Sequence, residues 1–207
     1  MIDELHKVFN SQIRYTFPFK QREIPRNGIY IIFEKGEYFK NYERIVRVGT
    51  HTGENKLVPR LKEHFVKENK NRSIFRKNIG RCMLNKVGSN YLPLWELDTT
   101  SRKDKEKNLK KLDLDFENEI EKKISDYIQT NLSFSVFEVE TKEKRLFWES
   151  KIISTLAKSG ELKPSVNWLG NYSTKEKIKS VGLWQVNELF NSSLTKEEMK
   201  ELKKLIL

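Results

Sequence analysis

Two short runs of β-branched and aromatic residues constrain the fold of this 207-residue chain more than any other feature. They are GIYIIFE (28–34) and RIVRVGTH (44–51), and the polar, glycine-containing segment KGEYFKNYE joins them. Two such runs on either side of a polar connection predict an antiparallel β-hairpin. Because Pro18 and Pro25 break the chain before the first run, we expect the domain core to begin after Pro25.

Helical and strand patterns account for most of the remaining chain. Apolar residues recur at the spacing of an α-helix in several segments, and one further segment alternates as a strand. The expected elements are helices over 2–15, 57–68, 73–84 and 142–159, a strand over 133–140, and a C-terminal helix opened by Thr195 with Glu198 three residues on. The fold class is therefore α/β (α+β), with a small three-stranded, mainly antiparallel sheet flanked by helices.

The domain organisation is expected to be simple. Residues 1–26 form an N-terminal helix and lead-in, residues 27–190 form the main domain, and residues 191–207 form a C-terminal helical extension. Within the main domain, residues 99–126 hold 8 basic and 8 acidic side chains and almost no aromatics. This composition indicates a charged helical insertion that is exposed to solvent.

The net charge of +11 is concentrated in the first half of the chain. Residues 1–90 carry 19 basic and 9 acidic side chains. A concentrated positive surface attracts phosphate backbones, because neutralised phosphates release condensed counterions. A lysine-rich proteome would give the same excess, and composition alone does not choose between these readings.

The cysteine content and hydropathy narrow the cellular setting. Cys82 is the single cysteine, so no intramolecular disulfide and no Cys/His zinc cluster can form, which indicates a reducing compartment. No stretch approaches the roughly 20 apolar residues of a membrane span, and the first residues lack the pattern of a signal peptide. The chain is expected to be cytoplasmic, without a membrane partner.

Glu149 interrupts the apolar face of the expected helix over 142–159. It lies three residues from Leu146 and three from Ile152, both of which belong to that face. A buried carboxylate without a partner costs several kcal/mol. Glu149 is therefore expected either to meet a cation in a cleft or to form a salt bridge with a core arginine.

Arg60, His64 and Tyr30 carry weaker signals when each is taken alone. Arg60 and His64 are four residues apart, so they project from one helix face and can contact one phosphate together, or simply decorate the surface. Tyr30 lies in the first strand, where a tyrosine commonly belongs to the core.

The order of these residues resembles the GIY-YIG nuclease superfamily. The resemblance covers about residues 27–190, and its specificity comes from five elements in the correct order with matching secondary structure. These elements are Gly28-Ile29-Tyr30, Arg47-Val48-Gly49, Arg60 with His64, Glu149, and Asn167. The second triplet departs from the family, and we read Val48 as standing where the family usually has a tyrosine.

The resemblance implies a metal-dependent endonuclease acting on DNA, with RNA as a further possible substrate. Glu149 would hold one Mg²⁺ or Mn²⁺, Arg60 would bind the phosphate, and Tyr30 would take the proton of the attacking water. His64 would accept a hydrogen bond or a proton from Tyr30. His51 follows the second triplet and is expected at the site mouth or simply at the strand end.

The asparagine that closes such sites is either Asn167 or Asn171, with Asn167 preferred. Trp168, Trp184 and Tyr172 are expected to pack the C-terminal segment against the sheet, with stacking on bases as the alternative. The DNA-binding residues expected from sequence lie on the second strand and on one basic side of the helix over 73–84. They are Arg47, Arg72, Arg76, Lys77 and Arg81.

Two other functional classes remain open at this point. A nucleic-acid-binding module that has lost turnover would keep the same fold, and a protein-interaction adaptor would leave the basic excess unexplained. Sequence specificity, nicking against double-strand cutting, biological role and oligomeric state, a homodimer included, are not determined by these patterns.

Overall fold

A long hairpin forms the centre of the sheet. In the computed structural model, which describes residues 1–206, β2 (Gly28–Phe39) pairs antiparallel with β3 (Tyr42–Gly49). The predicted hairpin is confirmed, but its loop is shorter than expected. Most of KGEYFKNYE belongs to the strands, and the turn is made at Lys40 and Asn41, with Lys40 at a φ of 54°.

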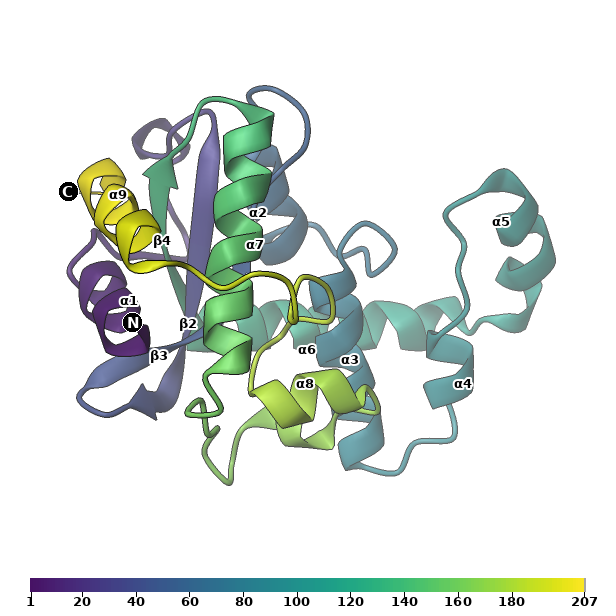
Figure 1. Cartoon of the computed structure of the whole chain (residues 1–207). Helices are drawn as coiled ribbons and strands as arrows, with labels where there is room; N and C mark the ends of the chain where they lie inside the picture. The colour runs from purple at the N-terminus through teal and green to yellow at the C-terminus, as the bar shows by residue number, and fades with distance from the viewer. Residues whose placement is uncertain (207) are drawn as a thin grey trace.

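The sheet has four antiparallel strands in the order β1-β4-β2-β3 (Figure 1). β4 (Leu132–Glu138) is the predicted third strand and pairs with β2. The additional strand is β1 (Tyr15–Thr16), which pairs with the outer edge of β4. It forms because α1 (Ile2–Asn10) ends earlier than the predicted helix over 2–15. The predicted fold class is confirmed, with this one small difference in strand number.

The helices predicted after the hairpin are present. They are α2 (Leu57–Phe65), α3 (Ile74–Lys86), α7 (Lys142–Lys158) and α9 (Lys196–Ile206). Thr195 and Glu198 form a reciprocal cap at α9, because the Thr195 amide donates to Glu198 at 2.7 Å and the Glu198 amide to Thr195 Oγ1 at 3.1 Å. The shorter elements are η1 (Gln21–Glu23), α4 (Leu92–Trp95), α5 (Arg102–Asn108), η2 (Leu109–Lys111), η3 (Leu169–Tyr172) and α8 (Glu176–Val181).

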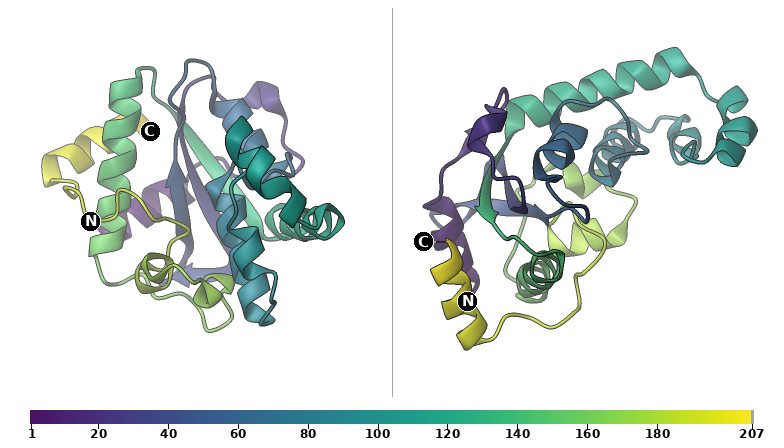
Figure 2. Two further views of the ribbon diagram at one scale, coloured as in Figure 1. Left: turned by 90° about the vertical axis from the view of Figure 1, so that its right-hand side faces the viewer. Right: turned by 90° about the horizontal axis from the view of Figure 1, so that it is seen from above.

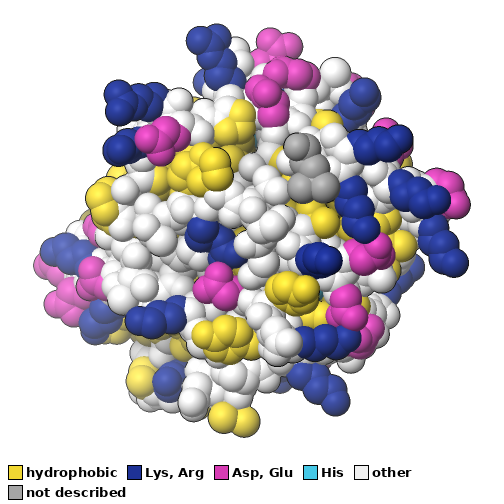
Figure 3. Space-filling view, turned by 90° about the vertical axis from the view of Figure 1, so that its left-hand side faces the viewer, with side chains coloured by type: hydrophobic (Ala, Val, Ile, Leu, Met, Phe, Trp, Pro, Cys, Tyr) yellow, Lys and Arg dark blue, Asp and Glu magenta, His cyan; other side chains and the backbone are white. Residues whose placement is uncertain are grey.

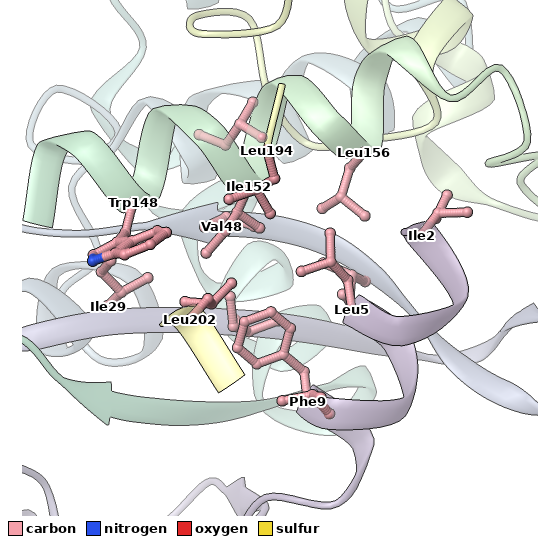
Figure 4. Packing of buried hydrophobic residues seen from close by; sticks show 14 of the residues in the cluster. Ile2, Leu5, Phe9, Ile29, Val48, Trp148, Ile152, Leu156, Leu194 and Leu202 are labelled. Carbon is pink, nitrogen blue, oxygen red and sulfur yellow. The ribbon is translucent and has the colours of Figure 1, made fainter. Parts of the chain in front are cut away.

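Alternation along the strands divides the buried residues between two cores. One face of the sheet packs on α1, α7 and α9, and Figure 4 shows Ile29 and Val48 on this side with Trp148 and Leu156 of α7. The opposite face carries Tyr30 and packs on α2, α3 and α6 (Leu114–Asn131). Since successive side chains of a strand point to opposite faces, neighbouring residues of one motif lie on different sides of the sheet.

The charged insertion is only partly the exposed segment that its composition predicts. Figures 1 and 2 show α4 and α5 at the outer end of α6, away from the sheet. α6 itself belongs to the domain, because it buries Ile120, Ile124 and Ile128 in the second core. Glu121 of the insertion therefore lies close enough to α3 to pair with Arg76.

Charges of both signs are mixed on the side formed by α1 and α9. Figure 3 shows lysine and arginine side chains interspersed with acidic ones on this face. Among the helices of residues 1–206, none is both long and apolar enough to span a membrane.

Candidate active site

Tyr30 lies in β2 opposite Gly49 of β3, on the face that packs against α2. A side chain at position 49 would overlap the Tyr30 ring, so the glycine of the second triplet is required for the ring to lie across β3. The Tyr30 hydroxyl is 2.8 Å from His64 Nε2. Only 1% of Tyr30 is exposed, so its hydroxyl is at the floor of the site.

Arg60 and His64 share one face of α2, as their spacing predicts. The two side chains differ in environment, since His64 is fully buried and a quarter of the Arg60 side chain is exposed. Arg60 Nη1 donates to Glu63 at 2.8 Å and to the Arg72 carbonyl at 3.0 Å. Burial alone would lower the pKa of the Arg60 guanidinium, but the negative charges that Tyr30 and Glu63 can carry raise it on balance.

The missing second tyrosine was assigned to the wrong position from sequence. Val48 pairs with Ile31 and is buried in the core beside α7 (Figure 4). Tyr30 belongs to the core on the opposite face of the sheet. Arg47 pairs with Ile32 and shares the face of Tyr30. Of the second triplet, Arg47 rather than Val48 therefore shares the face of Tyr30, because strand alternation sends Val48 to the other side of the sheet.

Arg47 connects the sheet to a C-terminal segment that the sequence did not identify as part of the site. The Trp184 amide donates to the Val46 carbonyl at 2.7 Å, which adds this segment to the open edge of β3. Arg47 Nη1 donates to the Trp184 carbonyl and, at 3.3 Å, to Gln185 Oε1. The signal for this contact is the segment SVGLWQVNE, whose apolar residues precede polar ones, but nothing local shows which strand edge it meets.

Glu149 extends from α7 to the end of β3. Its Oε1 accepts the Thr50 amide at 3.1 Å, immediately after the glycine that faces Tyr30. Burial raises the pKa of the Glu149 carboxyl to about 7, although Arg47 and the Thr50 amide act to lower it, and the charge of Glu188 raises it further. The alternative reading of Glu149 as one half of a salt bridge is not supported, because its hydrogen-bond partner is the Thr50 amide.

Glu149 offers one carboxylate ligand of the kind that a hard divalent cation prefers. A partly buried carboxylate that is costly to ionise is stabilised when a cation meets its charge. Within residues 1–206, no group of three or more His, Cys, Asp or Glu side chains is placed to hold a metal ion. Mg²⁺ suits such a site, since it keeps several waters and takes substrate oxygens together with one or two carboxylates.

The raised pKa of Glu149 predicts a cation-dependent stability. Because the folded state favours the neutral acid, stability falls as pH rises from 4.5 to about 7, by about 3 kcal/mol in total. Mg²⁺ should therefore raise the Tm more at pH 8 than at pH 6, since only the ionised carboxylate binds it. Differential scanning fluorimetry checks this shift.

Two variants on α7 make the stability measurement specific. Glu149→Gln should raise the metal-free Tm at pH 8 and abolish the response to Mg²⁺. Glu143→Gln removes the same charge from the exposed first turn of α7 and should respond like the parent. An equal Mg²⁺ shift in Glu149→Gln would place the cation elsewhere.

A pocket of about 380 Å³ opens beside these residues, and its lining includes Thr50, His51, Lys56, Arg60 and Glu63. The expectation that His51 lies at the site mouth agrees with this position. His51 Nε2 accepts the Gly28 amide at 3.3 Å, and Nδ1 is 2.6 Å from the Gly53 carbonyl. Both ring nitrogens are thus engaged with backbone. Burial lowers the pKa of His51, and the charge of Arg145 lowers it further.

The basic side chains predicted to form a surface on α3 are buried or half-buried. Arg76 is fully buried, and its Nη2 is 2.7 Å from Glu121 Oε2. Arg81 is buried as well, and its Nη2 donates to Glu96 Oε2 at 2.7 Å. Lys77 is half-buried and donates to the Glu96 carbonyl at 2.8 Å. Arg76 and Arg81 are therefore not available to contact DNA, because their charges are already paired inside the protein.

The remaining residues that the sequence singled out lie outside this group of site residues. Asn167 is exposed and lines a separate pocket with Leu84, while Asn171 donates to the Ser165 and Val166 carbonyls, so neither reaches Glu149 through a described contact. Trp168 and Trp184 both donate to the buried Glu34 carboxylate at 2.9 Å. Their predicted packing role is confirmed.

Comparison with known families agrees with this geometry. A family model described as GIY-YIG domain matches residues 1–207. Searches of curated proteins and of solved structures found no match.

Proposed function

The chain belongs to the GIY-YIG domain family, and on this premise we propose that it is a metal-dependent endonuclease that hydrolyses phosphodiester bonds in DNA. The observation that carries the proposal is the meeting of Tyr30, Arg60 and Glu149 at one end of the sheet, although they come from a strand and two different helices. Phosphodiester hydrolysis needs a base for water, a cation for the phosphate oxygens, and charge stabilisation of the leaving oxygen. Tyr30 and Arg60 match the first two requirements, and a cation held by Glu149 would match the third.

Each side chain has a distinct role in this proposal. Tyr30 takes a proton from the attacking water, and Arg60 binds a non-bridging phosphate oxygen. Arg60 is paired with Glu63 here, so a bound phosphate must replace Glu63 as its partner. Glu149 would hold one Mg²⁺ or Mn²⁺, which supplies positive charge beside the scissile phosphate and its leaving oxygen.

Arg47 adds a second fixed positive charge to the site. Its guanidinium lies near enough to act on both Glu149 and His64, and its Nε has no hydrogen-bond partner within the described chain. A buried cation of this kind favours an anionic phosphate beside it. Arg47 is thus proposed to act at the site itself rather than on a distant part of the DNA.

DNA outside the pocket is proposed to contact exposed cations around it. Lys56 lines the pocket, and the carbonyl of Arg72 accepts a hydrogen bond from Arg60. The side chains of Lys56 and Arg72 are both exposed. Affinity should fall steeply as salt rises, and Lys56→Gln with Arg72→Gln should reduce the salt slope by about 1 for each residue. Fluorescence anisotropy with a labelled duplex measures this slope.

A second pair of variants controls the salt measurement. Lys200→Gln and Lys204→Gln remove two positive charges from α9, on the opposite side of the sheet from the pocket, and should leave the slope unchanged. A salt response that is flat in the parent would count against nucleic acid as the partner.

A binding module without turnover is the second candidate, because the second triplet places Arg47 rather than a tyrosine on the face of Tyr30 and Arg60 is held by Glu63. Incubation of the protein with supercoiled plasmid, with and without Mg²⁺, separates the candidates. Metal-dependent nicking supports the endonuclease, whereas salt-dependent binding without nicking supports the module.

One active site cuts one strand, so a linear product would require a dimer or two successive binding events at the same place on the plasmid. A matched RNA substrate tests whether the sugar matters.

A further inference from the structure

Three buried side chains form a hydrogen-bonded chain behind the proposed site. Tyr30 Oη is 2.8 Å from His64 Nε2, and His64 Nδ1 is 2.7 Å from Ser73 Oγ. Ser73 is the N-cap of α3, and its Oγ also accepts the Arg76 amide at 3.2 Å. His64 and Ser73 have no exposed surface, so their described partners are protein groups, whereas Tyr30, with 1% exposed, reaches the floor of the proposed site.

The positions of the hydroxyl protons determine which groups donate and which accept in these hydrogen bonds. The Arg76 amide can only donate, so Ser73 Oγ must accept from it. Ser73 then needs an acceptor for its own hydroxyl proton, and in residues 1–206 its only further partner is His64 Nδ1. If Nδ1 carried the proton, Ser73 Oγ would accept from both Nδ1 and the Arg76 amide, and its own hydroxyl proton would stay buried without an acceptor, which proteins rarely tolerate. In the opposite tautomer the hydroxyl proton left over is that of Tyr30, whose Oη lies at the floor of the proposed site, where a reacting water can accept it.

We infer that Ser73 donates to His64 Nδ1 and thereby fixes the imidazole in the tautomer that carries its proton on Nε2 and donates it to the Tyr30 hydroxyl oxygen. This direction is opposite to the one expected from sequence, in which His64 accepts from Tyr30. Ser73 is a positioning residue, since it reaches the reacting atoms only through His64.

The charges around His64 agree with a neutral ring of fixed direction. Burial lowers the pKa of His64 well below its ordinary value, and the charges of Arg60, Arg47 and Arg76 lower it further. A neutral imidazole has one N–H, so the identity of the protonated nitrogen decides what Tyr30 meets. His64 surrounded by three cations is a poor acceptor for a further proton.

The consequence for Tyr30 depends on the proposed endonuclease function. In this direction the Tyr30 hydroxyl oxygen accepts a hydrogen bond from His64 Nε2 and lies near the Arg60 guanidinium. To take a proton from the attacking water, Tyr30 must first give up its own. The proton that Tyr30 loses beforehand goes to solvent, because His64 does not receive it.

Nitrogen NMR of the intact protein tests the tautomer directly, and two internal references are available. His6 Nδ1 is 3.0 Å from the Ile2 carbonyl and its Nε2 accepts the Ile45 amide, and the His51 ring has the same pattern with Gly53 and Gly28. Both rings must therefore carry their proton on Nδ1. These and His64 are the three histidines of the chain.

A long-range ¹H–¹⁵N correlation spectrum of ¹⁵N-labelled protein should show two rings protonated on Nδ1 and one protonated on Nε2. The His64→Gln variant assigns the third ring by its loss. A His64 ring protonated on Nδ1, or on both nitrogens at neutral pH, would overturn the inference. The spectrum does not depend on catalysis, so it decides the tautomer even if the protein fails to cut plasmid.

Variants at Ser73 connect the tautomer to cleavage. Ser73→Ala should give a mixed or Nδ1-protonated His64 ring and lower the single-turnover rate by roughly 10- to 100-fold, the usual cost of losing an outer-shell partner. Ser73→Thr keeps the hydroxyl and the helix cap, and should restore both the spectrum and the rate. Ser101→Ala, which removes the equivalent cap from α5, should change neither. Parental cleavage by Ser73→Ala with an altered His64 ring would show that the tautomer has no part in catalysis.

Discussion

Glu149→Gln is expected to lose metal-dependent cleavage by roughly 1000-fold or more while keeping its affinity for DNA. The variant removes the carboxylate that accepts the Thr50 amide at the end of β3, and several kcal/mol of transition-state stabilisation would depend on the cation that it is proposed to hold. The amide of glutamine can still accept from the Thr50 N–H, so the fold around the carboxylate is preserved. A plasmid nicking assay and anisotropy on the same preparations measure the two properties separately.

The pH dependence of the parent provides a second readout for the same residue. Because the pKa of Glu149 is about 7, protons compete with the cation below that value, and the rate at limiting Mg²⁺ should rise as pH passes through 7. Raising the Mg²⁺ concentration should move this rise to lower pH. Glu143→Gln should reproduce the parental profile. Full activity in Glu149→Gln would remove the basis for the whole assignment.

The hairpin and the helices that carry the site could be predicted from the sequence because their signals are local. The alternation in 28–34 and 44–51 depends only on neighbouring residues, and so does the helical spacing of Arg60 and His64. Thr195 and Glu198 cap α9 through the same kind of short-range signal. The additional strand β1 was missed because two residues are too few to show a period.

The environment of the arginines could not be predicted, because their partners are distant in sequence. Arg76 lies off the apolar stripe of α3 and was read as exposed, yet Glu121 of α6 comes from the charged insertion and buries it. Arg81 is covered in the same way by Glu96. A helical pattern shows which side chains share a face, but it does not show what covers that face.

Arg47 illustrates a different limit of prediction from the sequence. The sequence showed that the second triplet departs from the family, but the tyrosine position was placed at Val48, one residue from the side chain that occupies the site. A shift of one residue in a strand exchanges the two faces of the sheet. The contact of Arg47 with Trp184 and Gln185 depended on a segment more than a hundred residues away, which no local pattern could place.

Tyr30→Phe is expected to lower the single-turnover cleavage rate by roughly 100- to 10,000-fold, the range that general-base groups typically contribute. The phenylalanine ring fits the same space against Gly49, so the change is confined to the hydroxyl. Binding of Mg²⁺ and of DNA should persist, because Glu149 and the exposed cations are unchanged. Rapid-quench measurement with excess enzyme isolates the chemical step from product release.

The loss of the hydroxyl also removes the partner of His64 Nε2, so some loss of stability must be separated from the loss of catalysis. A buried group left without its partner costs about 1–3 kcal/mol, which thermal unfolding of Tyr30→Phe would detect. Tyr38→Phe, on the same strand but 62% exposed, is the matched control and should be parental in both rate and stability. A folded Tyr30→Phe protein that cleaves at the parental rate would rule out Tyr30 as the base. Since His64 is buried behind Tyr30 among three arginines, it could not take over that role, and the base would have to come from the DNA or from solvent.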